Sequence, residues 1–181
     1  MTTRAQVVAS AAALAAELGP DRLRLADVAR KCDISIGTLY KHVPSREHLL
    51  EAVSATAEDI VIAVMDAAAP QNSPLLPALP ALARALLAVP ERSPLVRVLL
   101  RATPAPAVDV QGAAPRVRAW IAARIRTAQA AGEVGACDPD PVAHLAFGLV
   151  SAALTLTPRR RAADVVADHL SRGLRGLLPG P

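Results

Sequence analysis

The 181-residue sequence predicts an all-α protein, and three observations support that fold class. Hydrophobic residues make up 52% of the chain, and many of them are alanine, which has the highest helix propensity. Aromatic residues make up only 2%, and the alternation of apolar and polar residues that is typical of strands is rare. Prolines and glycines separate segments of helical length. Because the charged share is 20%, the chain should be globular rather than disordered.

The first fifty residues should form a small helical domain. Three helices are expected, at about 3–18, 25–32 and 36–43. Gly19-Pro20 ends the first, since a C-cap glycine followed by proline stops a helix. Pro44 ends the third. A tight turn at Asp33-Ile34-Ser35 joins the second and third helices, so that the pair predicts a helix-turn-helix.

The rest of the chain should form a second helical domain, with the boundary between residues 1–50 and 51–181. A fourth helix is expected from Ser45, a good N-cap, to about Ala69. Prolines then predict a break and a hinge, at Pro70, Pro74, Pro77 and Pro80. Further helices are expected near 78–89, 94–103, 115–131, 139–156 and 159–178.

The third helix carries the residues that point to a function. It is too short to contribute much core, yet it holds the only tyrosine, Tyr40, next to Lys41 and His42 and close to Thr38. Gly37 lets a backbone approach a partner closely. A helix of this kind fits the major groove of DNA, where Tyr and Lys reach phosphate, sugar or base edges. The alternative is that Tyr40 caps a small core and that Lys41 is merely solvated.

Residues 24–50 resemble the N-terminal DNA-binding domain of the TetR family of transcriptional regulators. The resemblance is carried by Val28-Ala29, Ser35, Gly37-Thr38-Leu39-Tyr40-x-His42, and Ser45-Arg46 before a leucine pair. It implies that the recognition helix faces DNA through Thr38, Tyr40, Lys41 and His42, with Gly37 at the close approach. It also implies a phosphate contact by Arg46, and it makes Arg24 and Ser35 further phosphate candidates. The implied partner is double-stranded operator DNA, bound by a repressor that a small-molecule effector releases.

The sequence departs from the family pattern at four positions. Arg24 stands where a capping Thr or Ser is usual, and this loss should loosen the second helix by about 1 kcal/mol. Asp33 replaces the usual glycine of the turn, and Asp tolerates left-handed conformations better than most residues. Val43 replaces a phenylalanine, and Ile36 replaces a residue that is often basic. Ile36 therefore puts one phosphate contact in doubt.

The second domain should bind the effector and form a homodimer through residues 139–178. Bulky, soft side chains there are few, and the candidate ligand contacts are Met65, Trp120 and Phe147. Arg97, Arg101 and Arg124 could meet an anion, but the stronger interpretation is that all six are ordinary core and surface residues. Apolar stripes are expected on the last two helices, at Leu145, Leu149, Ala152 and Ala153 on one and at Val166, Leu170, Gly173, Leu174 and Leu177 on the other. Such stripes predict a four-helix interface between two subunits and a palindromic operator.

Other functions have weaker support. No catalytic triad, cofactor motif or local metal-ligand spacing is present, and His144 and His169 are expected to be structural rather than metal ligands. The net charge of +4 suits an anionic partner, and two cysteines fit a cytoplasmic protein. The alanine-rich start predicts an amphipathic helix rather than a signal peptide, and no membrane span is expected. The alternative function is a helical-bundle carrier or enzyme that binds an apolar small molecule.

Overall fold

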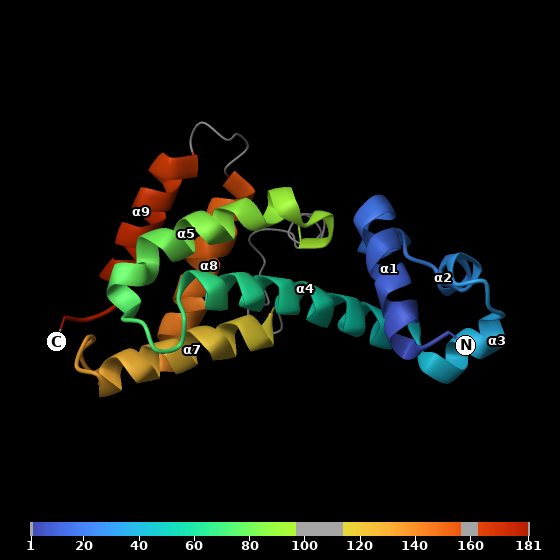
Figure 1. Cartoon of the computed structure of the whole chain (residues 1–181), viewed down its shortest axis with the longest axis horizontal. Helices are drawn as coiled ribbons and strands as arrows, with labels where there is room; N and C mark the ends of the chain where they lie inside the picture. Colours follow the sequence, from blue (N-terminus) through green and yellow to red (C-terminus); the bar gives the residue numbers. More distant parts are fainter. Residues whose placement is uncertain (1, 97–113, 157–162, 181) are drawn as a thin grey trace. The chain divides into compact units, whose positions relative to one another are not determined.

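The computed structural model describes residues 2–96, 114–156 and 163–180, and these residues form helices with no strand. The all-α class is therefore confirmed for this part of the chain (Figure 1). Contacts divide the chain into two compact units. The first contains Met1–Asp59 and the described residues of Pro90–Thr103, and the second contains Ile60–Val89 and the described residues of Pro104–Pro181. The expected boundary between residues 50 and 51 stays a prediction, and among the described residues 90–96 also belong to the first unit.

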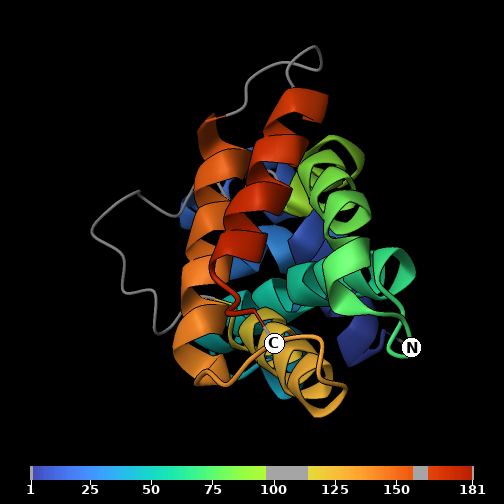
Figure 2. The same cartoon turned by 90° about the vertical axis from the view of Figure 1, so that its left-hand side faces the viewer.

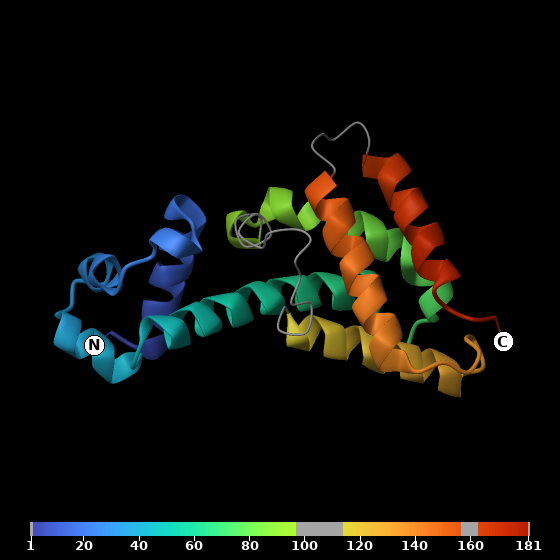
Figure 3. The same cartoon turned by 180° about the vertical axis from the view of Figure 1, so that it is seen from behind.

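The first unit is built from short helices (Figure 3). They are α1 (Arg4–Leu18), a 3-10 turn η1 (Pro20–Arg22), α2 (Leu25–Lys31), α3 (Ile36–His42) and the first part of α4 (Arg46–Ala68). Thr3 begins α1 through a capping box with Gln6, and Gly19 ends it at a φ of 91°. Buried side chains from all four helices form the core, including Val7, Ala11, Ala15, Leu23, Val28, Leu39, Val43, Leu49 and Val53.

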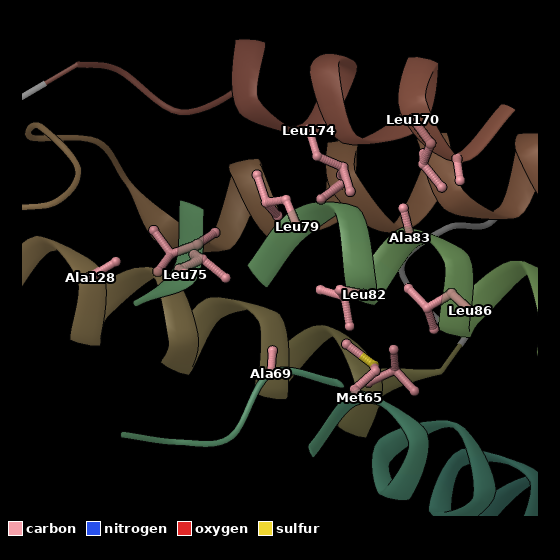
Figure 4. Close-up of a cluster of buried hydrophobic side chains, with 14 of the residues drawn as sticks. Met65, Ala69, Leu75, Leu79, Leu82, Ala83, Leu86, Ala128, Leu170 and Leu174 are labelled. Atoms are coloured by element: carbon pink, nitrogen blue, oxygen red, sulfur yellow. The ribbon is translucent and has the colours of Figure 1, made fainter. Parts of the chain in front are cut away.

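The second unit contains the rest of α4 with α5 (Leu75–Arg92) up to Val89, and with α7 (Pro115–Ala130), α8 (Pro139–Leu156) and α9 (Ala163–Gly176). Helix α8 packs against both α7 and α9, and α8 and α9 lie side by side (Figure 2). Leucines of α5 line up in a core with Met65 of α4 and with Leu170 and Leu174 of α9 (Figure 4). Among the helices that the structure describes, none is both long enough and apolar enough to cross a bilayer.

The expected proline break is wrong at two positions, because Pro77 and Pro80 lie inside α5. Proline is tolerated in a first turn, where backbone N–H groups lack helical partners. The Glu133 carboxylate accepts hydrogen bonds from the backbone N–H groups of Leu75 and Leu76, at 2.8 and 2.5 Å. Since Pro80 cannot donate to the carbonyl of Leu76, the guanidinium of Arg175 donates to it instead, at 3.3 Å. Two side chains from distant segments therefore stabilise this start of α5.

The remaining helix expectations have mixed outcomes. Helix α8 has the expected bounds, and α7 ends one residue before the expected end at 131. Helix α5 extends past the expected end at residue 89, through Pro90. Of the helix expected at 94–103, residues 97–103 lie outside the described part of the chain, as do 159–162 of the last helix.

The prediction that the apolar stripe of the last helix faces a second subunit is wrong for two leucines. Leu170 is 3% exposed and Leu174 is 7% exposed, and both belong to the core of their own subunit. The side chains of α9 that are exposed include Val165 and His169. The apolar face of α9 packs against α5 of the same chain. Leu170 and Leu174 therefore do not need a second subunit to be buried.

Candidate DNA-binding surface and ligand cavity

The start of helix α3 is fixed by Ser35. Its hydroxyl accepts a hydrogen bond from the backbone N–H of Thr38 at 3.1 Å, as an N-cap does, and it lies 2.9 Å from the Thr38 hydroxyl. Leu39 and Val43 are 0% and 1% exposed and anchor the other face of the helix. The rotation of α3 about its axis is therefore determined by its cap and by two buried side chains.

The outward face of α3 carries the residues that the sequence singled out. Tyr40 is 50% exposed, and Gly37 and Lys41 are exposed as well. Thr38 and His42 are partly exposed on the same short helix. The exposure of Tyr40 argues against a role in capping the core, because a ring used for packing would be covered. The arrangement leaves a phenol, an ammonium and an imidazole accessible to a partner.

The turn before α3 depends on Asp33. Its φ of 53° is left-handed, a region that most side chains avoid and that Asp tolerates. The backbone N–H of Ile34 then donates to Ala29, at 3.0 Å, and closes the end of α2. The expectation that Asp replaces the usual glycine without breaking the turn is confirmed.

Arg46 has a structural role that sequence reasoning missed. Its Nε donates to the carbonyl of Leu23 at 3.0 Å, and its Nη2 donates to the carbonyls of Pro20 and Asp21, at 2.9 and 3.2 Å. The side chain is half-buried and ties the segment between α1 and α2 to the start of α4. Its Nη1 makes no hydrogen bond to any residue that the structure describes. No local sequence signal identifies backbone acceptors more than twenty residues away.

The remaining candidates for DNA contact and helix capping lie at the starts of α2 and α4. Arg24 is exposed and precedes α2 without a side-chain cap, as the departure from the family pattern predicted. The Ser45 hydroxyl accepts from the backbone N–H of His48 at 3.3 Å, which supports its expected capping role. The backbone N–H of Glu47 itself and the Ser45 hydroxyl hold the pKa of the exposed Glu47 carboxyl below its usual value.

The second unit contains a cavity of about 50 Å³. Its walls are mainly aliphatic and come from every helix of the unit: Met65, Leu75, Leu79, Leu82, Leu86, Trp120, Ile121, Arg124, Ile125, Val142, Ala146, Val150, Leu174, Leu177 and Leu178. Two of the three ligand candidates, Met65 and Trp120, line it, whereas Phe147 packs against the surrounding core without lining it. The Trp120 indole N–H donates to Asp66 at 2.8 Å.

The late histidines are held within their helices. His144 contacts the carbonyl of Asp140 through Nδ1 at 2.8 Å and Arg118 through Nε2, and His169 contacts the carbonyl of Val165 at 2.7 Å. Across the described ranges, no three His, Cys, Asp or Glu residues come together in a group that could hold a metal ion. Hydrogen bonding accounts for the orientation of both rings.

Comparisons with known proteins agree with this geometry. Residues 7–53 match the family of bacterial regulatory proteins, tetR family. Together with the exposed face of α3, this match identifies a DNA-binding transcriptional regulator. Its N-terminal domain belongs to the TetR family, as the sequence resemblance predicted. No curated protein sequence matches the chain.

Solved structures share the fold over nearly the whole length. RolR without ligand has a TM-score of 0.70 and 21% identity, covering 94% of this chain and 89% of RolR. The multidrug binding protein EbrR, complexed with imidazole, has a TM-score of 0.72 and 20% identity, covering 98% of this chain and 90% of EbrR. AibR, in complex with isovaleryl coenzyme A and operator DNA, has a TM-score of 0.64 and 18% identity, covering 94% of this chain and 97% of AibR. The family match over residues 7–53 is therefore accompanied by a shared fold along both units.

Proposed function

We propose that this protein is a cytoplasmic repressor that binds a palindromic operator through α3 and is released by a small molecule bound in the second unit. The observation that carries the proposal is the presence, in one chain, of an exposed recognition helix and a separate apolar cavity. A carrier or enzyme would need the cavity but has no use for the exposed Tyr40 and Lys41. AibR, which has the same fold, was solved with both a ligand and operator DNA.

The proposed DNA contacts follow from the exposed face of α3. Tyr40 would place its hydroxyl on phosphate and its ring on a sugar or a thymine methyl group, and Lys41, His42 and Thr38 would contact base edges or phosphate. Gly37, whose added Cβ would meet only the Ser35 hydroxyl at 3.9 Å, leaves space for a backbone to approach. Arg24, Ser35 and the free Nη1 of Arg46 are proposed as further phosphate contacts, with Ser35 also capping the helix.

Helix α4 supplies the proposed connection between ligand and DNA. It is a continuous helix of 23 residues that carries Arg46 at its start and Met65, a wall residue of the cavity, near its end. A ligand that displaces Met65 would bias the position of α4, and Arg46 would pass that change to the segment before α2. Ligand binding can shift DNA affinity only if the two states of the protein bind the ligand differently.

The test has two stages. Selection from random double-stranded DNA should enrich a sequence with two-fold symmetry, whose half-sites lie about one helical turn or somewhat more apart. A screen for compounds that dissociate the selected complex should then yield ligands that bind the free protein. If no DNA sequence is enriched, the regulator proposal is contradicted. If compounds bind the cavity but none of them releases the operator, the proposed mode of control is contradicted.

We further propose that the protein forms a homodimer through α8 and α9 within residues 139–178. Three of the exposed large hydrophobic side chains of the described residues lie on these two helices: Leu145 at 60%, Leu149 at 37% and Val165 at 59% exposure. Gly148, Ala152 and Gly173 beside them are also exposed and small, which allows close helix packing. Burying a leucine side chain fully contributes about 1.5–3 kcal/mol.

A matched pair of substitutions tests this interface. Leu145→Glu should yield a folded monomer with weak operator binding, because it places a charge in the proposed interface. Leu170→Glu should instead destabilise the fold itself, because that side chain is 3% exposed within its own subunit. Light scattering and far-UV circular dichroism distinguish the two effects. A Leu145→Glu protein that remains dimeric at micromolar concentration would contradict this assignment of the interface.

A further inference from the structure

Ile36 is an exposed apolar residue at the start of α3. It is the first residue of the helix, directly after the capping Ser35, and its side chain is 45% exposed. Isolated apolar side chains are common on protein surfaces and need no explanation. Ile36 is not isolated, because Tyr40 follows it by four residues and is 50% exposed. Residues four apart are neighbours on one face of a helix, so Ile36 and the ring of Tyr40 form an apolar row on α3.

The rest of α3 leaves this apolar row accessible. The next row on the same helix consists of Gly37 and Lys41, which are both exposed. A side chain at position 37 would lie beside the apolar row, and glycine leaves that side open. The hydroxyl of Thr38 lies 2.9 Å from that of Ser35, so it belongs to the cap at the start of the helix. The exposed face of α3 therefore presents an apolar surface next to one ammonium group.

An isoleucine side chain can make only one favourable kind of contact with a base in the major groove. It has no hydrogen-bond donor or acceptor, so it cannot bind phosphate or pair with the polar edge of a base. Guanine, adenine and cytosine present donors or acceptors in the major groove, whereas thymine also presents its C5-methyl group. Isoleucine placed over a polar edge would remove water from that edge without replacing the hydrogen bonds. The methyl group of thymine is therefore the base group that suits Ile36.

We propose that Ile36, beside the ring of Tyr40, selects a thymine in each operator half-site by contact with its C5-methyl group. The inference rests on the proposed function of α3 as the recognition helix, and it names one base that this helix reads. A basic residue at position 36 would contact phosphate, which positions a protein on DNA without specifying a sequence. Isoleucine replaces that contact by one that depends on the base. Because it is β-branched, its side chain has few rotamers and loses little freedom when it is buried.

Deoxyuridine tests the contact, because it pairs with adenine as thymidine does and lacks only the methyl group. An operator is first selected from random double-stranded DNA with the full-length wild-type chain. Each thymine of the selected duplex is then replaced by uracil in turn, and affinity is measured by fluorescence anisotropy at one fixed salt concentration. One replacement should lower the affinity about fourfold, and the same replacement in both half-sites about fifteenfold, as expected for burial of one methyl group each. Affinity that is insensitive to every replacement would overturn the proposal.

Variants assign the effect to Ile36. Ile36→Ala should bring the ratio of affinities for the thymine and uracil duplexes to about one, since it removes the side chain that covers the methyl group. Ile36→Val keeps a β-branched apolar side chain and should retain most of the wild-type ratio. An unchanged ratio in Ile36→Ala would contradict the assignment, even if Tyr40→Ala abolished the ratio.

Leu18→Ala is the matched control. Leu18 is also 45% exposed and belongs to the same unit, but it lies in the last turn of α1. Its replacement should keep the wild-type ratio, and a loss equal to that of Ile36→Ala would contradict a specific role of Ile36. Both positions are exposed, so circular dichroism should show wild-type helicity in both variants. If Ile36→Ala does not fold, the wild-type protein with the thymine and uracil duplexes decides the question.

Failure of this inference is distinguishable from failure of the proposed function. If the wild-type protein enriches an operator but binds its uracil and thymine forms equally, the regulator proposal stands and the role of Ile36 falls. If no DNA sequence is enriched, the regulator proposal falls and the role of Ile36 falls with it.

Discussion

Replacing Arg46 with alanine separates a structural role from a DNA-contact role. In the structure Nε and Nη2 donate to three backbone carbonyls, at distances from 2.9 to 3.2 Å, and hold the segment between α1 and α2 against α4. A hydrogen bond from a charged donor contributes roughly 1.5–3 kcal/mol. Because the side chain is only half-buried, we take the lower end for each of the two nitrogens and expect a loss of about 2–3 kcal/mol in the free energy of unfolding.

The expected loss can be measured by thermal denaturation of the full chain. For a protein of this size 1 kcal/mol corresponds to roughly 2–4 °C in Tm, so Arg46→Ala should lower Tm by about 4–12 °C. Arg4→Ala, which removes an exposed arginine from α1, is the matched control and should leave Tm nearly unchanged. Arg46→Lys should lie between the two, since lysine keeps the charge without the planar fork that reaches three carbonyls.

Operator binding at several salt concentrations tests the other role. A phosphate contact made by the remaining Nη1 predicts that Arg46→Ala reduces the slope of log affinity against log salt by about 0.9. A lower Tm with an unchanged slope would leave only the structural role. A variant that melts within a degree of the wild type would refute the structural reasoning, whatever its effect on DNA binding.

Three further predictions concern the first unit. Tyr40→Ala and Lys41→Ala should each weaken operator binding with unchanged helicity by circular dichroism, and unchanged affinity in both would remove α3 from the interface. Asp33→Val should lower the free energy of unfolding by about 1 kcal/mol or more, because a β-branched residue is poorly accommodated at positive φ, whereas Asp33→Gly should be tolerated; chemical denaturation measures both. The lowered pKa of Glu47 contributes stability at pH values above its unfolded pKa and loses it as the pH falls through the folded pKa. The Tm difference between wild type and Glu47→Gln should therefore shrink on acidification.

Local signals in the sequence were sufficient to predict the helices of the first unit. Helix α3 was expected at 36–43 and spans Ile36–His42, because Ser35 caps its start and Pro44 follows its end. Gly19 and Pro20 likewise ended α1 where expected. Each of these signals acts within a few residues, so the sequence contains all the information needed. The same reasoning identified Tyr40 and Lys41, which the structure places on the exposed side of α3.

Interactions between distant segments could not be predicted in this way. Pro77 and Pro80 predict a break, yet α5 runs through them, because Glu133 in the loop after α7 and Arg175 of α9 form hydrogen bonds with its backbone. Arg46 and Arg124 donate to carbonyl oxygens that have no side-chain signature, so their partners are invisible in the sequence. The cavity could not be predicted from local signals either, because its walls come from five helices.

The last helix shows what a hydrophobic pattern determines and what it leaves open. The spacing of Leu170 and Leu174 correctly marks one face of α9 as buried, but the pattern is the same whether a neighbouring helix or a second subunit covers that face. The structure assigns these two leucines to the core of their own chain. It leaves Leu145, Leu149 and Val165 exposed, although only the first two were part of the expected interface. An interface is therefore better sought among apolar side chains that remain exposed once the subunit has folded than among those with the strongest periodicity.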